Sequence, residues 1–98
     1  MNKKVSEITV DDIANYLRLF EPSEEEKEYI GIILTSTKYY ILTYTGLRNE
    51  ELDNYPELSI VVFVLCSDLY DNRAYYVDKN NINRTVESIL NLHSRNLL

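Results

Sequence analysis

Glycine and proline are scarce in this chain of 98 residues, which contains two of each. Sandwiches and barrels need many turns, and turns are rich in these residues, so the scarcity argues against both architectures. Cysteine is scarcer still. The one cysteine, Cys66, cannot form a disulfide within the chain, so nothing here indicates an oxidising compartment. Its place inside an apolar run favours a small buried side chain over a reactive thiol.

Long hydrophobic runs are also missing. The longest uninterrupted apolar run covers residues 60–66, far short of the roughly 20 residues that span a bilayer. Lys3 and Lys4 precede no hydrophobic segment, so the sequence predicts no signal peptide. We therefore expect a soluble protein with no membrane partner, present inside the cell when it is made.

Positive charge is in deficit, with ten Lys and Arg against 16 Asp and Glu and a formal net charge of −6. The basic residues are scattered along the chain. An acidic chain of this kind is repelled by a phosphate backbone, which argues against nucleic-acid binding through a basic patch. An acidic surface along which DNA merely slides remains compatible with the composition.

The motifs of common catalytic sites are absent as well. The sequence has no glycine-rich phosphate loop, no cysteine pair and no His-x-x-x-His spacing, and its one histidine is His93. A lone histidine on an amphipathic helix favours packing or surface exposure over a role as a base. The clustered carboxylates fall at two expected helix starts, where capping explains them: Asp11, Asp12, Glu24, Glu25 and Glu26. We expect no enzyme activity, no cofactor and no metal site.

The apolar residues that are present concentrate between Pro56 and Arg73. A helix that is apolar on every side must be buried, so the other elements are expected to pack around it. The β-branched residues of this stretch are also typical of a buried strand, which is the alternative interpretation. Leu65, Leu69 and Tyr70 continue the apolar stripe at helical steps, Pro56 suits a helix start, and no second strand-like run exists. The sequence predicts a buried central helix at about 57–72.

The sequence predicts further helices in the rest of the chain. The first eight residues are polar and are expected to be frayed. Thr9 is the expected N-cap of a helix at about 10–19, and Ser23 with Glu26 forms the capping box of the longest helix, at about 24–45. Gly46 is placed for a left-handed C-cap. A short turn capped by Asn49, a loop at 74–82, a last helix at about 83–92 and a tail at 93–98 complete the chain. We predict one all-α domain over residues 1–98, a small bundle of four helices plus a short turn.

Tyrosine is abundant, with nine residues, whereas tryptophan is absent. Tyrosine buries a large ring, keeps a polar hydroxyl and is enriched at protein interfaces. Several tyrosines at helical positions are expected at the edge of the core: Tyr16, Tyr29, Tyr44 and Tyr70. Tyr75, Tyr76 and Val77 lie in an otherwise polar loop and predict a partner surface. Tyr39 and Tyr40 crowd one end of the long helix and are further interface candidates.

Three stretches stand in order along the chain: ITVDDIANYLRL, YIGIILTSTKYYILTYTG and IVVFVLCSDLYDNR. Their motifs are Tyr16-Leu17-Arg18, Tyr40 and Tyr44 before Thr45-Gly46, and Asp71-Asn72-Arg73. Together, over about residues 8–92, they resemble the small head–tail connector proteins of tailed phages and prophages, also called head-completion or DNA-packaging adaptor proteins.

The resemblance implies a structural virion protein that forms an oligomeric ring with copies of itself between portal and tail. Its partners would be the portal protein and a downstream head-completion or tail protein, and DNA would only pass through the channel that the ring extends. The location would be the host cytoplasm during assembly and then the head–tail junction of the virion. The family contains no enzymes, so no catalytic residues are implied. The long helix and the 74–82 loop would carry the contacts.

Asp71-Asn72-Arg73 is expected to be structural. Asn72 is suited to end the central helix, and Arg73 is suited to donate hydrogen bonds to carbonyls left free at the helix end.

Two other functions stay open. A small acidic helical protein can act as a DNA mimic that inhibits a host nucleic-acid enzyme, although a mimic needs carboxylates in rows rather than at helix starts. A small hydrolase or metalloenzyme would need a convergent polar site, which the sequence does not display.

Overall fold

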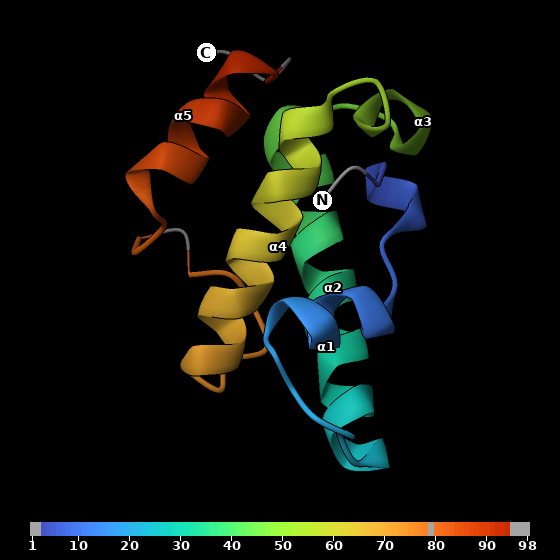
Figure 1. Ribbon diagram of the computed structural model, residues 1–98. Helices are drawn as coiled ribbons and strands as arrows, with labels where there is room; N and C mark the ends of the chain where they lie inside the picture. Colours follow the sequence, from blue (N-terminus) through green and yellow to red (C-terminus); the bar gives the residue numbers. More distant parts are fainter. Residues whose placement is uncertain (1–2, 79, 95–98) are drawn as a thin grey trace.

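The computed structural model describes residues 3–78 and 80–94 (Figure 1). In chain order the elements are a 3-10 turn η1 (Val5–Glu7) and the helices α1 (Val10–Tyr16), α2 (Glu24–Thr45), α3 (Asn49–Leu52), α4 (Pro56–Asp71) and α5 (Arg84–Leu92). These residues contain no strand. The predicted all-α bundle of four helices and a short turn is confirmed, with α3 as the turn.

Helix α4 is the centre of the fold. It lies between α2 and α5, and α1 crosses in front of α2 and α4 (Figure 1). Pro56 occupies the first turn, where its missing N–H costs nothing. The apolar side chains that α4 buries are Leu58, Val61, Val62, Phe63, Leu65, Cys66 and Leu69. Ile60 is 44% exposed, so the prediction of a helix buried on every side is wrong there: the described elements leave this position uncovered.

Helix α2 has the ends that the sequence predicts. The Ser23 hydroxyl accepts the Glu26 N–H at 3.1 Å, and Gly46 adopts a left-handed φ of 72°, with its N–H donating to the Leu42 carbonyl at 2.9 Å. The predicted capping box is only half formed. The Glu26 carboxylate turns away from the Ser23 backbone and binds side chains at the end of α4.

Helix α1 is shorter than predicted. It ends at Tyr16, and Arg18 follows with a left-handed φ of 60°. The Arg18 N–H donates to the Asn15 carbonyl and the Leu19 N–H to the Ala14 carbonyl, each at 3.0 Å. This pair of bonds is a Schellman motif, which normally has glycine at the left-handed position. Because an arginine occupies that position, no residue type in the sequence marks the helix end.

Residues 3–8 also differ from the expectation of a frayed end. Val5 and Ile8 are each only 3% exposed and join the core. The Ser6 N–H and hydroxyl donate to the Asp53 carboxylate at 3.0 and 2.6 Å, and the Lys3 ammonium lies 2.9 Å from the Asp12 carboxylate. Apolar side chains at two positions thus anchor the segment, despite its polar composition. Residues 1 and 2 lie outside the described chain.

The short helices differ from prediction only at their caps. The Arg48 N–H donates to the Glu51 carboxylate at 3.0 Å, so α3 is capped one residue before Asn49. The Asn83 side chain accepts the N–H groups of Thr85 and Val86 and caps α5. Of the predicted tail, the structure describes residues 93 and 94, and residues 95–98 lie outside it.

Candidate protein-interaction surfaces

One face of α2 is exposed and uncharged. Ile32, Thr35, Tyr39 and Thr43 recur at three- and four-residue steps on this side of the helix, and we call them the α2 face. Ile32 is 48% exposed and Tyr39 69% exposed. The solvent-facing stripe of a helix in a globular protein ordinarily carries charged residues. The α2 face carries none.

The surrounding sequence shows how complete this lack of charge is. Residues 29–47 contain no Asp or Glu, although the whole chain has 16. Their one charged residue is Lys38, whose ammonium group donates to the Ile8 carbonyl at 3.3 Å. Burial lowers the pKa of Lys38. The single charge of this stretch is therefore partly buried against the N-terminal segment rather than presented beside Tyr39.

The two predicted interface tyrosines of α2 lie in different surroundings. Tyr39 is exposed on the α2 face, whereas Tyr40 is half-buried with its ring centroid 5.8 Å from that of Tyr44. Burial is the first cause of the raised pKa of Tyr40. Tyr39 is thus available to a partner, and Tyr40 packs at the edge of the core.

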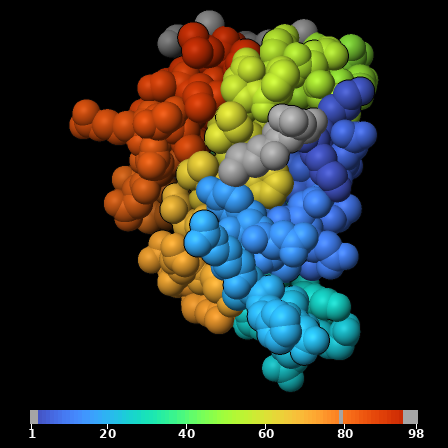
Figure 2. Space-filling view, in the orientation of Figure 1, coloured from blue at the N-terminus to red at the C-terminus, as the bar shows by residue number. Residues whose placement is uncertain are grey.

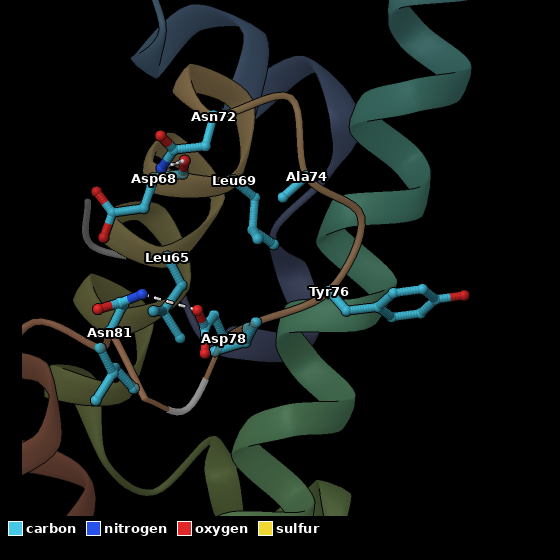
Figure 3. A pocket seen from close by; sticks show the side chains of 10 residues that line it. Leu65, Asp68, Leu69, Asn72, Ala74, Tyr76, Asp78 and Asn81 are labelled. Atoms are coloured by element: carbon cyan, nitrogen blue, oxygen red, sulfur yellow. Dashed lines mark hydrogen bonds between the residues drawn. The ribbon is translucent and has the colours of Figure 1, made fainter.

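The predicted partner surface in the 74–82 loop is likewise divided. Tyr75 packs edge-on against Tyr29, with ring centroids 5.3 Å apart, while part of its ring stays exposed. Tyr76 is exposed and its ring points away from the loop (Figure 3). Val77 is half-buried. Tyr76 is the freest of the three side chains.

Beneath this loop lies a hollow of about 390 Å³, formed with the second half of α4 (Figure 3). The residues that line it are Leu65, Asp68, Leu69, Asn72, Ala74, Tyr76, Val77, Asp78, Asn81 and Ile82. Apolar side chains make up half of this lining, and the polar ones include two carboxylates and two amides. The sequence did not predict this hollow, because it depends on how the loop folds back onto α4.

The predicted structural motif at the end of α4 is built around Arg73. The Arg73 guanidinium lies 3.0 Å from the Glu26 carboxylate and 4.5 Å from the centre of the Tyr70 ring. The prediction that it binds free helix carbonyls is therefore wrong, because the Glu26 carboxylate is the stronger acceptor. The Asn72 side chain takes that role and donates to the Asp68 carbonyl at 2.9 Å. Asp71 is the last residue of the helix, one residue before the predicted end, and Asn72 follows as its C-cap.

The same cluster shifts two pKa values. The Tyr70 hydroxyl donates to Glu26 at 2.6 Å, and this bond, followed by the one from Arg73, lowers the pKa of Glu26. The pKa of Tyr70 is raised chiefly by the same bond. The cluster therefore joins the first turn of α2 to the last turn of α4.

Among residues 3–78 and 80–94, the large apolar side chain with the greatest exposed fraction is one that the sequence did not predict. Phe20, in the segment between α1 and α2, is 88% exposed. Its neighbour Leu19 packs against the core, so the segment is anchored while Phe20 is not. No sequence signal was available, because Phe20 continues the helical spacing of Ile13 and Leu17 and is exposed only because α1 ends at Tyr16.

Cys66 and His93, the two side chains with catalytic potential, pack against other residues. Cys66 is fully buried, and burial raises its pKa to about 11. His93 stacks on Tyr55 with ring centroids 4.3 Å apart, and its Nε2 lies 2.6 Å from Glu57 Oε1. In residues 3–78 and 80–94, no three His, Cys, Asp or Glu side chains are grouped so that they could hold a metal ion.

Comparison with known proteins gives no relative: no family model, no curated protein and no solved structure matches the chain. Among the described helices, none combines the length and the apolar character needed to cross a membrane. The exposed α2 face, the hollow with its aromatic rim and the Phe20 segment are thus the features on which a functional argument rests.

Proposed function

We propose that the chain is a structural assembly protein of a tailed phage or prophage, a head–tail connector subunit that forms a ring with copies of itself and docks on the portal protein. The α2 face carries the assembly part of this proposal. This face is an uncharged stripe on a 22-residue helix of a chain with a net charge of −6. It is suited to contact another protein, because desolvating it requires no charge to be paired.

The connector part rests on the sequence resemblance, and the fold adds one observation to it. The three motifs that carry the resemblance stand at the C-terminal ends of α1, α2 and α4. Two of them place an arginine in the left-handed conformation just after the helix, at Arg18 and Arg73, and the third places Gly46 there. The three motifs therefore coincide with helix ends in this chain. The acidic balance suits a channel wall that does not hold DNA.

The test is the mass of the purified chain, measured by light scattering behind a sizing column, alone and with the portal protein of the same genome. We expect a multimer of the 11.5 kDa chain or a defined complex with the portal. Tyr39→Glu places a charge on the α2 face and is expected to weaken that assembly. Ser88→Glu is the matched control, since it adds the same charge at an exposed position of α5.

The outcomes separate the candidate functions. A chain that stays a single copy and ignores the portal contradicts the connector proposal, and tight binding to a host nucleic-acid enzyme would then favour the DNA-mimic alternative. Equal loss of assembly in Tyr39→Glu and Ser88→Glu would show that added charge, and not the α2 face, is responsible. Loss in Tyr39→Glu alone supports the proposal.

A further inference from the structure

Phe20 is presented to solvent by a segment that the backbone holds firmly. Figure 2 shows the segment between α1 and α2 as a projection at the lower end of the molecule. Arg18 and Glu21 have left-handed φ values of 60° and 46°, on either side of Phe20, and Pro22 follows. Such conformations are strained for residues with side chains, and they persist where the surroundings fix them. A fixed segment loses little conformational entropy when it binds.

Arg18 adds a charge to this projection. It is exposed, and within residues 3–78 and 80–94 its guanidinium group makes no ion pair or hydrogen bond. Leu19, between Arg18 and Phe20, packs on the core. The projection therefore offers a partner one aromatic ring and one unpaired cation.

The hollow beneath the 74–82 loop has the complementary chemistry. Leu65, Leu69, Val77 and Ile82 supply apolar lining, and Asp68 and Asp78 supply two carboxylates. No cation lies against either carboxylate in the described chain, and Lys79, next in sequence, is outside it. Burial and the neighbouring Asp71 raise the pKa of Asp68, which is the effect expected of a carboxylate that lacks a positive partner.

The size of the hollow also fits. Apolar cavities of about 150 Å³ accept benzene, so a hollow of about 390 Å³ holds a phenyl ring and part of an arginine side chain. Because Phe20 is 88% exposed, it does not fill the hollow of its own molecule.

We propose that the Arg18–Phe20 projection of one copy inserts into the hollow between α4 and the 74–82 loop of the next copy, with Phe20 on the apolar lining and Arg18 paired with Asp68 and Asp78. This contact rests on the ring proposed above and names its subunit interface. It joins two different surfaces of the chain, and head-to-tail contacts of this kind generate rings when the rotation closes.

The contact makes a prediction about mixtures that a symmetric interface does not make. Phe20→Ser removes the projecting ring but keeps the hollow, and Val77→Arg fills the hollow with a cation but keeps the projection. Each variant alone is expected to lose the multimer and run near the 11.5 kDa chain mass. Mixed together, they retain one competent contact and are expected to form a pair of chains and nothing larger.

Light scattering measures the masses in whichever condition, alone or with portal, assembles the wild-type chain. Leu92→Ser is the matched control, because Leu92 is an equally isolated apolar residue on α5 with 81% exposure. Circular dichroism monitors folding. If Val77→Arg does not fold, Asp68→Arg replaces it at an exposed position. A second chain that carries Arg18→Asp is then expected to restore the ion pair between the projection and the hollow.

The outcomes distinguish this contact from the function on which it rests. A wild-type chain that assembles while Phe20→Ser and Val77→Arg assemble equally well overturns the contact and leaves the connector proposal standing. Loss in both variants without a pair in the mixture also overturns the head-to-tail contact. A wild-type chain that stays single in both conditions overturns both proposals together.

Discussion

Two arginines in this chain have the same backbone and different side-chain surroundings. Arg18 and Arg73 each hold a left-handed conformation at the second residue after a helix, a position that glycine normally occupies. The Arg73 side chain contacts Glu26 and two tyrosines. The Arg18 side chain has no such contact in the described residues. The two positions therefore separate the backbone cost of an arginine from the benefit of its contacts.

We predict that Arg18→Gly raises the free energy of unfolding by about 0.5–1 kcal/mol, because it removes left-handed strain of roughly 1–2 kcal/mol but adds entropy to the unfolded chain. Arg73→Gly removes the same strain and also the contacts with Glu26 and Tyr70, so it is expected to be the less stable of the two. Urea unfolding measures both. Equal shifts in the two variants would mean that the Arg73 contacts contribute nothing.

Acid is expected to destabilise the chain through three carboxylates, those of Glu26, Asp12 and Asp53. The pKa of Glu26 is lowered from its ordinary 4.5, and those of Asp12 and Asp53 from 3.8, by hydrogen bonds that exist only in the folded state. A lowered folded-state pKa means that the stabilisation is complete above the ordinary value and is lost as pH falls through the folded-state value. The unfolding free energy should therefore decline below about pH 4.5.

The raised pKa of Asp68 acts in the opposite direction, because its protonation favours the folded chain, and it reduces the slope. Glu26→Gln is expected to flatten the acid limb in denaturation curves recorded across this range. An unchanged limb would assign the acid sensitivity to Asp12 and Asp53 instead.

At the scale of helices, the sequence predicted the helix ends that local hydrogen bonds determine. Thr9, Ser23 and Gly46 mark ends that are confirmed, because a cap bonds to its own helix. The sequence-based prediction failed where contacts between residues far apart in the chain determine the structure. The Glu26 carboxylate prefers Arg73 and Tyr70 to its own N-cap, and Val5 is held by packing that no local pattern reveals.

The two glycines lie in helical positions of opposite character. A methyl group on Gly31 would meet the Val10 side chain at 3.7 Å, an ordinary contact, whereas Gly46 has a φ of 72°. We predict that Gly31→Ala raises the unfolding free energy by about 1 kcal/mol through helix propensity. Gly46→Ala should lower it by about 1 kcal/mol through left-handed strain. Thermal unfolding of both variants checks the opposite signs, and a destabilised Gly31→Ala would show that α1 and α2 need a closer approach.

At the scale of the whole molecule, the carboxylates are unevenly distributed along the chain. The carboxylates gather at helix starts, while residues 29–47 present an uncharged face. Tyr39, Tyr75 and Tyr76 were predictable as surface candidates because aromatic residues stood at polar or crowded positions. Phe20 and the hollow were not, because one depends on where α1 ends and the other on how a loop returns to α4.

The burial of Cys66 makes its thiol a probe of opening motions. The sulfur is fully buried, 3.6 Å from the Thr37 hydroxyl, and its pKa of about 11 keeps it protonated. We predict that an aromatic disulfide reagent leaves the native chain unmodified and reacts fully in urea. Slow labelling without denaturant then reports how often α4 separates from α2, and immediate labelling would contradict the burial. With its own thiol protected, the chain can accept one introduced cysteine, at position 20 or 39, as a uniquely addressable position for a dye.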